Sequence, residues 1–167
     1  MLAQSFAKNF GLYGERCGTL SVVCSNEEER SIVLSQLKGL IRPMYSSPPK
    51  YGSSLVKTVL GDEELTAQHV RECAAMADRI GSVRQLLVKE LRKAGSTFDW
   101  SHIASQIGMF AYTGLTPSMV DQMTSQYEIY MARDGRMSLP GLNVDNVAYV
   151  AQAMHAVSKG KSITETN

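Results

Sequence analysis

The chain has 167 residues, of which 44% are hydrophobic and 20% are charged, as in an ordinary water-soluble globular domain. Lys and Arg number 17 against 16 Asp and Glu, so the formal net charge of +1 argues against a protein that coats nucleic acid or a basic membrane surface protein. The longest apolar runs, such as residues 20–24, fall far short of the roughly 20 residues of a membrane span. Membrane-spanning, collagen-like and wholly disordered chains are therefore excluded.

The cysteines do not follow the spacing of a disulfide framework or a metal site. Cys17, Cys24 and Cys73 are odd in number and form no CxxC pair. We therefore predict small apolar side chains in a reducing compartment, and no metal site. The first residues have neither a signal-peptide layout nor an Arg-rich transit-peptide layout. We expect a cytoplasmic protein, with a mitochondrial location as the alternative.

The N-terminal part is predicted to contain a loop, a strand and a helix. Residues 8–16 carry two glycines and an asparagine, which is typical of an ordered loop. Residues 18–24 are rich in β-branched side chains and predict a short buried strand. Ser25 is expected to cap a helix, with Glu28 completing a capping box.

A Pro/Ser/Gly-rich stretch and a long helix are expected next. Pro43 cannot continue a helix and favours an extended conformation at Arg42. Residues 43–54 therefore predict a linker or an ordered surface loop. Acidic residues and then apolar residues in steps of three and four predict one long helix over 62–94. Because long helices often bridge two substructures, we place a boundary near residue 75.

The C-terminal part predicts a small α+β unit. Thr116 followed by Pro117 is a strong helix start, and Asn143 is expected to cap a last helix. A polar tail follows. The other expected elements are a short helix at 100–106, a strand at 107–113, and a hairpin of two strands at 129–132 and 136–139.

Residue types alone do not decide the chemistry. Lys8 has apolar neighbours in sequence, and a desolvated lysine is a neutral nucleophile, but a solvated surface lysine is the alternative that residue type favours. Ser5 and Arg16 offer hydrogen-bond donors to a phosphate. Arg42 and Arg136 could bind carboxylates through bidentate hydrogen bonds. For each arginine, an ordinary structural salt bridge is the alternative interpretation.

Four stretches of sequence are more specific than these statistics. Residues 4–18, QSFAKNFGLYGERCG, closely resemble the signature of the class I pyridoxal-phosphate aminotransferases of the aspartate aminotransferase family. Residues 42–49, 106–115 and 135–142 resemble further signatures of that family in order and spacing. The resemblance extends over nearly the whole chain, to about residue 158.

The resemblance implies a cofactor site. Lys8 matches the lysine that holds pyridoxal 5'-phosphate covalently and then moves the proton at the α-carbon of the substrate. Ser5 and Arg16 match groups that bind the phosphate of this cofactor.

The resemblance also implies a substrate site for dicarboxylates. Arg136 matches the arginine that clamps the α-carboxylate. Arg42 matches the arginine that binds the distal carboxylate of aspartate or glutamate, and that the partner subunit of a homodimer supplies. Phe110 matches an aromatic residue near the substrate.

The implied fold is α/β, namely the C-terminal part of a fold-type-I aminotransferase. We expect residues 1–75 to be the remnant of the cofactor-binding large domain and its sheet. A long bridging helix then leads to the small α+β domain at 76–160, and 161–167 form a tail. Family members are more than twice as long as this chain, so we expect only part of such an enzyme.

The implied reaction is the transfer of an amino group between L-aspartate and 2-oxoglutarate. Three alternatives stay open. The chain alone would be a catalytically inactive domain fragment, or the substrate would be an aromatic amino acid. The third alternative is a non-enzymatic helical interaction module, which leaves residues 8–18 unexplained.

Overall fold

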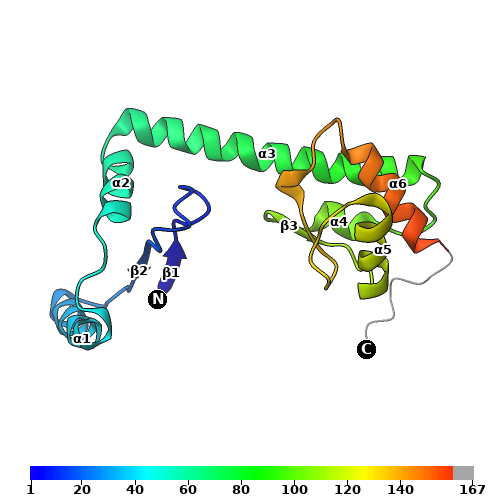
Figure 1. The fold of residues 1–167 in the computed structure, drawn as a ribbon. Helices are drawn as coiled ribbons and strands as arrows, with labels where there is room; N and C mark the ends of the chain where they lie inside the picture. Colours follow the sequence, from blue (N-terminus) through cyan, green and yellow to red (C-terminus); the bar gives the residue numbers. More distant parts are fainter. Residues whose placement is uncertain (160–167) are drawn as a thin grey trace. The chain divides into compact units, whose positions relative to one another are not determined.

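The computed structural model describes residues 1–159 and divides into two compact units, residues 1–73 and the residues from 74 onward (Figure 1). The assignment of these units to a large and a small domain stays a prediction. The tail expected at 161–167 lies outside the described residues. No helix in the described part of the chain is long and apolar enough to cross a membrane.

The first unit joins a two-stranded sheet to three helical segments. Gly18 lies opposite Ser5 in the antiparallel pair, and a Cβ at this glycine would lie 2.5 Å from the carbonyl oxygen of Gln4. The strand predicted at 18–24 is shorter than expected and exposed, not buried, because only one other strand pairs with it. In chain order the unit contains β1 (Leu2–Ser5), β2 (Gly18–Ser21), α1 (Glu27–Tyr45), α2 (Tyr51–Leu60) and the first part of α3 (Glu63–Lys93).

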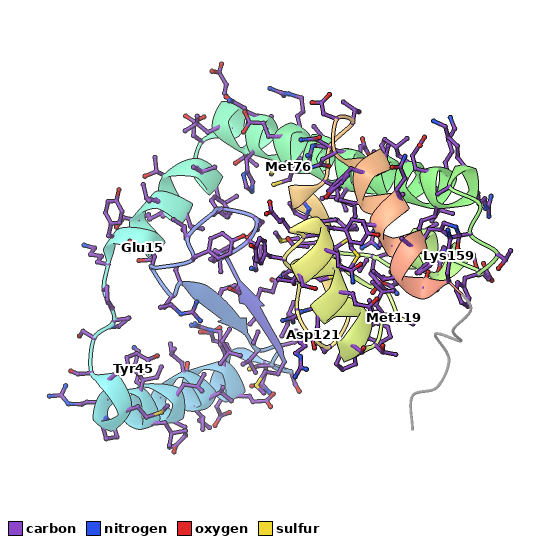
Figure 2. The ribbon with its side chains drawn as sticks, turned by 45° about the vertical axis from the view of Figure 1, so that its right-hand side comes forward. Glu15, Tyr45, Met76, Met119, Asp121 and Lys159 are labelled. Carbon is purple, nitrogen blue, oxygen red and sulfur yellow. The ribbon has the colours of Figure 1, made fainter. Side chains whose placement is uncertain are left out.

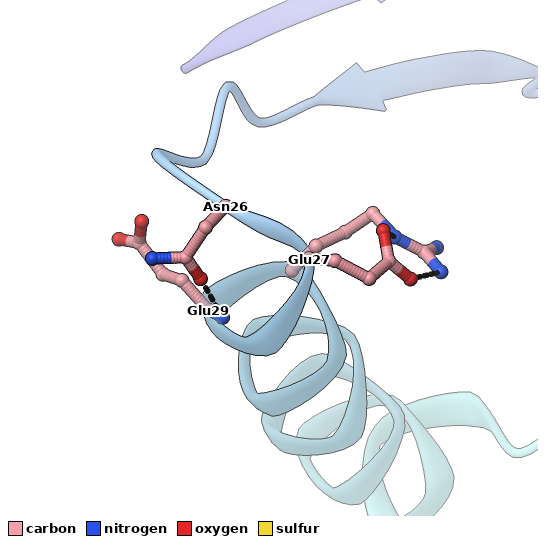
Figure 3. Close-up of polar contacts among 4 residues, drawn as sticks. Asn26, Glu27 and Glu29 are labelled. Atoms are coloured by element: carbon pink, nitrogen blue, oxygen red, sulfur yellow. Dashed lines mark hydrogen bonds and ion pairs between the residues drawn. The ribbon is translucent and has the colours of Figure 1, made fainter.

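The start of α1 lies one residue later than predicted. Asn26, not Ser25, is the N-cap, and its side-chain oxygen accepts a hydrogen bond of 2.8 Å from the backbone N–H of Glu29 (Figure 3). The carboxylate of Glu29 accepts one of 2.6 Å from the backbone N–H of Ser25. The cap therefore lies one position later than predicted, and the Glu29 carboxylate accepts the N–H of the residue before the N-cap, not the N–H of the N-cap itself as in a capping box. In the same turn Glu27 pairs with Arg30.

The end of α1 is also later than predicted. Pro43 lies inside the helix, which continues to Tyr45. The backbone N–H of Ser46 then donates to the carbonyl of Ile41, five residues back, at 3.3 Å. Proline removes one hydrogen bond of the helix, but this wider bond and the positive φ of Ser46 (59°) close the last turn. The extended conformation predicted for Arg42 is wrong.

The stretch predicted as a linker or loop at 43–54 contains the start of α2. Its first turn is fixed by the carbonyl of Lys50, which accepts hydrogen bonds of 2.9 Å from the hydroxyls of Ser53 and Ser54. Gly52 packs so closely on residues 15 and 17 that an added Cβ would lie 2.9 Å from the Cβ of Glu15. The glycine and serines that suggested a loop therefore serve a helix start and a tight packing contact.

The long helix α3 is confirmed over almost the predicted range. The side chain of Asp62 accepts a hydrogen bond of 2.9 Å from the backbone N–H of Leu65 and caps its start. At its end, Gly95 adopts φ +88°, and Ser96 donates its backbone N–H to the carbonyl of Leu91 at 3.1 Å. This is the glycine-terminated helix end that the sequence predicts.

The second unit has an apolar core at which several helices meet. Leu87 and Leu91 of α3, Ile103 of α4 and Met154 of α6 are all fully buried. Met119 of α5 is 1% exposed and belongs to the same apolar core (Figure 2). The unit contains the rest of α3, then α4 (Ser101–Ser105), β3 (Phe110–Tyr112), α5 (Pro117–Tyr127), β4 (Arg136–Ser138), the 3-10 helix η1 (Leu139–Gly141) and α6 (Val147–Ser158).

The hairpin predicted between 129–132 and 136–139 is wrong, because β4 pairs with β3 instead. The expected tight turn exists: the backbone N–H of Gly135 donates to the carbonyl of Ala132 at 3.0 Å. The antiparallel partner comes from further back in the chain. This pairing buries Ala111 and Met137 against the core, at 0% and 4% exposure, which explains why the distant strand is preferred.

An exposed ion pair on the second unit predicts a pH dependence. The Nε and Nη2 groups on one edge of the Arg133 guanidinium donate to the two carboxylate oxygens of Asp121, at 3.0 and 2.8 Å. This bidentate contact holds the pKa of Asp121 below its ordinary value of 3.8. The contribution of the pair to the free energy of unfolding is therefore complete above about pH 4 and is lost as the pH falls through the lowered pKa. In urea unfolding at a series of pH values, we expect the unaltered chain to lose more stability on acidification than Arg133→Gln. Equal losses in both proteins would contradict this role.

Candidate functional site

The loop at 6–17, which joins β1 to β2, carries Lys8. Short-range hydrogen bonds hold its two ends together. The backbone N–H of Phe6 donates to the carbonyl of Cys17 at 3.0 Å, and the backbone N–H of Ala7 donates to the hydroxyl of Ser5 at 3.1 Å. A tight turn follows, in which Gly11 donates to the carbonyl of Lys8 at 3.2 Å and adopts φ +65°.

The aromatic neighbours of Lys8 in sequence pack onto α3. The ring of Phe10 stacks on His69 with a centroid distance of 4.1 Å and meets the ring of Phe6 edge-on at 5.4 Å. The carbonyl of Asn9 lies 3.7 Å from the thiol sulfur of Cys73. The loop is therefore anchored through its apolar side chains.

The amine of Lys8 lies above the ring of Tyr13. Its Nζ is 4.2 Å from the ring centroid, a cation–π distance. The carbonyl of the same Tyr13 accepts a hydrogen bond of 3.1 Å from a guanidinium N–H of Arg16. Lys8 is exposed in this structure, as its residue type predicts. Tyr13 thus contacts both the expected cofactor lysine and an expected phosphate ligand.

One cavity brings Ser5 and Arg16 together at the base of the hairpin. It has a volume of about 310 Å³. Ser5 carries a hydroxyl and Arg16 a guanidinium, and both groups suit a phosphate, because charge-assisted hydrogen bonds to phosphate are strong. Lys8 is not among the residues that form this wall. These residues are Ala3, Gln4, Ser5, Arg16, Cys17 and Gly18.

Arg16 itself has an unusual backbone conformation. Its φ is +50°, a region that side chains other than glycine rarely adopt. Such a conformation costs of order 1–3 kcal/mol and persists where the surroundings enforce it. The hydrogen bond to Tyr13 and the pairing of Ser5 with Gly18 are the contacts that fix this corner.

Arg42 is placed apart from the cavity of Ser5 and Arg16. It lies in the last turn of α1, is exposed, and does not line that cavity. Among the residues that the structure describes, it forms no ion pair. Its guanidinium is therefore open to a carboxylate that another molecule or chain brings to it.

Arg136 and Phe110 share the exposed face of the β3–β4 sheet in the second unit. The guanidinium carbon of Arg136 lies 5.1 Å from the centroid of the Phe110 ring. Tyr112 is the direct partner of Arg136 across the two strands, and it lies on the same face because Ala111 between the two aromatic residues points into the core. No carboxylate of the described residues pairs with Arg136. Phe110 and Tyr112 therefore lie on the same face as Arg136, whose positive charge is available to bind an anionic ligand.

Sequence reasoning assigned no role to Tyr13 and missed Arg84. Tyr13 lies inside the signature that was recognised, but its contact with Lys8 depends on how the loop folds. Arg84 interrupts the apolar face of α3, between Val83 and Leu87 of the helical pattern. It is 3% exposed, and burial lowers the pKa of its guanidinium. A single charged residue at an apolar position of the periodic pattern was the available signal.

Comparisons with known proteins identify the family of this chain. The family model for aminotransferase class I and II matches residues 1–154. A relative named mitochondrial aspartate aminotransferase from Dictyostelium discoideum is 56% identical over 158 residues, which cover 95% of this chain and 37% of the relative. One of the same name from Arabidopsis thaliana is 51% identical, with the same coverage. The chain thus spans little more than a third of the length of these relatives, as expected from its resemblance.

Solved structures of aminotransferases are similar to this chain in fold and in sequence. A mitochondrial aspartate aminotransferase from Trypanosoma brucei has a TM-score of 0.89 and 52% identity, covering 93% of this chain and 41% of that one. An aromatic-amino-acid aminotransferase from Burkholderia pseudomallei, described as covalently bound to pyridoxal phosphate, has a TM-score of 0.88 and 44% identity, covering 93% and 39%. The α/β fold of part of an aminotransferase is therefore confirmed, and the chain belongs to the class I and II aminotransferases.

Proposed function

We propose that this chain supplies the cofactor lysine and the main anion-binding arginines of a pyridoxal-phosphate-dependent aspartate aminotransferase. The observation that carries the proposal is the cavity at the hairpin base, where Ser5 and Arg16 converge beside the loop of Lys8. Membership of the family accounts for residues 8–18, which a helical interaction module leaves unexplained. The reaction is the exchange of the amino group between L-aspartate and 2-oxoglutarate.

Lys8, Ser5 and Arg16 form the cofactor side of the proposed site. Pyridoxal phosphate supplies an electron-withdrawing ring, which no side chain offers. The hydroxyl of Ser5 and the guanidinium of Arg16 bind its phosphate. The amine of Lys8 would hold the cofactor by condensing with its aldehyde, with loss of water. Once the amino group of the substrate has displaced it, the free amine would be placed to move the proton at the substrate α-carbon. Without cofactor, the amine of Lys8 lies over the ring of Tyr13.

Arg136 and Arg42 form the substrate side. Arg136 binds the α-carboxylate, against the ring of Phe110. Arg42 binds the distal carboxylate, and its exposed place on α1 suits a role in the site of a partner subunit, so that the working enzyme is a homodimer. Two arginines select dicarboxylates, because a substrate that lacks one carboxylate leaves a desolvated guanidinium unpaired.

The names of the relatives support aspartate over aromatic substrates. The curated relatives named aspartate aminotransferase share 50–56% identity with this chain, which supports aspartate as the substrate. Identity to the solved structures does not separate the two classes, since it is 42% and 52% for two aspartate aminotransferases and 44% for the aromatic-amino-acid aminotransferases. Several of these relatives are named as mitochondrial, which supports the mitochondrial alternative for the location of this protein over the cytoplasmic one.

The test is covalent labelling of the chain. Pyridoxal phosphate is added, borohydride makes any link to a lysine permanent, and mass spectrometry of peptides locates the label. We expect the label on Lys8 to exceed that on Lys50, an exposed lysine of the same unit, and inorganic phosphate to reduce the excess. Lys8→Arg should lose the excess and leave Lys50 as before. Equal labelling of both lysines would contradict the proposal.

A coupled assay with aspartate and 2-oxoglutarate distinguishes the active enzyme from an inactive segment. We expect the 167-residue chain alone to give no turnover, because it spans 37% of the length of its relatives. Turnover with an aromatic amino acid but not with aspartate would favour the other substrate class.

A further inference from the structure

The β3–β4 sheet has a defined set of outward-facing backbone groups. Thr113 donates its backbone N–H to the carbonyl of Gly135, and Leu139 donates to that of Met109, both at 3.0 Å. Because hydrogen-bonded pairs alternate along an antiparallel ladder, the pairs that include Phe110 and Tyr112 are non-hydrogen-bonded. The backbone N–H and carbonyl groups of these two residues therefore point away from β4. In the described part of the chain, β3 has no strand on that side.

Gln106 takes the place of the missing strand at Tyr112. Its side-chain oxygen accepts the backbone N–H of Tyr112 at 2.8 Å, and its side-chain nitrogen donates to the carbonyl of Tyr112 at 3.1 Å. A carboxamide has the same donor and acceptor as a peptide group, so one side chain reproduces both hydrogen bonds that a neighbouring strand would make. Tyr112 is thereby fixed opposite Arg136.

Arg84 completes the same edge at Phe110. Its buried guanidinium donates to three carbonyl oxygens, those of Ile103, Gly108 and Phe110, each at 2.8 Å. The planar fork of an arginine spans such divergent acceptors, whereas a lysine ammonium is a single point. The main chain at Phe110 is therefore held from α3, while its ring faces the guanidinium of Arg136.

We propose that Gln106 and Arg84 are positioning residues, which hold β3 so that Phe110 and Tyr112 flank Arg136 in a geometry competent to bind a carboxylate. Neither side chain touches the substrate. The inference rests on the proposed function in that Arg136 is the carboxylate ligand. Without these side chains the outer edge of β3 exchanges its protein hydrogen bonds for water, and the aromatic wall beside Arg136 loosens.

The experiment observes Arg136 directly in the whole 167-residue chain. Arginine is labelled with nitrogen-15, and the side-chain Nε–H resonance of Arg136 is assigned by its absence in Arg136→Lys. Phe110→Leu defines the resonance position without the aromatic ring. The test variants are Gln106→Met, Gln106→Glu and Arg84→Met. The matched control is Arg79→Met, since Arg79 also lies on α3 and also donates to a carbonyl, that of Leu142 at 2.9 Å, away from β3.

We expect Gln106→Met and Arg84→Met to move the Arg136 resonance toward its position in Phe110→Leu. Gln106→Glu keeps the acceptor but sets a carboxylate oxygen against the Tyr112 carbonyl in place of the donor, so it should move the resonance at least as far as Gln106→Met. Arg79→Met should leave the resonance in place. In a titration with L-aspartate followed on the same resonance, loss of a positioning hydrogen bond should weaken binding by about 2- to 10-fold.

The outcomes distinguish the positioning role of Gln106 and Arg84 from the carboxylate-binding role of Arg136. An unmoved Arg136 resonance in Gln106→Met, with the helical circular dichroism signal retained, overturns the inference. This variant, at a half-buried position, remains informative if Arg84→Met does not fold. A resonance that moves as expected supports the inference even if aspartate leaves Arg136 unaffected in the unaltered chain. An Arg136 resonance that does not respond to aspartate in the unaltered chain would instead overturn the role of Arg136 in the proposed function.

Discussion

Leu87→Ala is expected to destabilise the second unit by about 2–5 kcal/mol, because it removes buried methyl groups and leaves a cavity. Leu87 is fully buried in the C-terminal part of α3, in the same core as the helices α4, α5 and α6. A core packed from three directions cannot collapse onto the space left by an alanine. This substitution should therefore cost far more than the same change at an exposed leucine of α3.

The single tryptophan provides the measurement. Trp100 is 2% exposed in the same core, so its fluorescence in urea reports the unfolding of this unit. The matched control is Leu65→Ala, the same substitution on the same helix at a residue that is 40% exposed. A midpoint for Leu87→Ala that equals that of Leu65→Ala would contradict the packing described here.

Gly18→Ala is expected to open the β1–β2 hairpin and to remove the excess label on Lys8. The added Cβ would lie 2.5 Å from the carbonyl oxygen of Gln4 and 3.5 Å from the Cα of Ser5. Both are backbone atoms of the paired strand, so relief requires a shift of β1 itself. Overpacking of this kind costs about 1–3 kcal/mol. The same shift separates the walls of the cavity that Ser5 and Arg16 share.

Amide hydrogen exchange at Phe6 measures the opening, because its N–H donates to the carbonyl of Cys17 across the base of the hairpin. Gly14→Ala is the control in the same loop, since an added Cβ there meets no atom within 4 Å and its φ is not positive. That change should leave protection of Phe6 intact or raise stability slightly, by restricting the unfolded chain. Equal exchange rates in the two variants would disprove the steric role of Gly18.

Elements whose signals lie within a few residues were predictable. Thr116 does cap α5, with its hydroxyl accepting the backbone N–H of Met119 at 3.4 Å, and Pro117 is its first residue. The range of α3 was predicted from its apolar periodicity and from Gly95. In each case the interaction that decides the structure is local, so the sequence pattern contains it.

Elements decided by distant partners were not predictable. Residues 136–139 had a clear turn before them, yet β4 pairs with β3, because only that pairing buries Ala111 and Met137 together. Pro43 is a general helix terminator, but the hydrogen bond from Ser46 to Ile41 accommodates it. Both failures reflect contacts formed only in the folded chain.

The candidate site was predictable only through its resemblance to a family. Residue type alone favoured a solvated Lys8, and the structure agrees that the side chain is exposed. The roles proposed for Lys8, Ser5 and Arg16 came from one short signature, and the hairpin then brings Ser5 and Arg16 to one cavity. Gln106 lies inside a recognised signature and Arg84 interrupts an apolar helix face, but neither pattern indicates a role for the side chain, because both bind main-chain atoms that only the fold brings to them.

The bonding of the β3–β4 sheet also bears on self-association. The outward carbonyl of Phe110 is occupied by Arg84, and both outward groups of Tyr112 are occupied by Gln106. On the opposite side, the backbone N–H of Arg136 donates to the Asp134 carboxylate at 3.0 Å, and its carbonyl accepts the N–H of Ala132 at 3.1 Å. At Tyr112 and Arg136 the outward backbone groups are already satisfied, so these positions cannot pair with a strand from another copy. The side chains that shape the arginine site thus also protect this small sheet from amyloid-like growth.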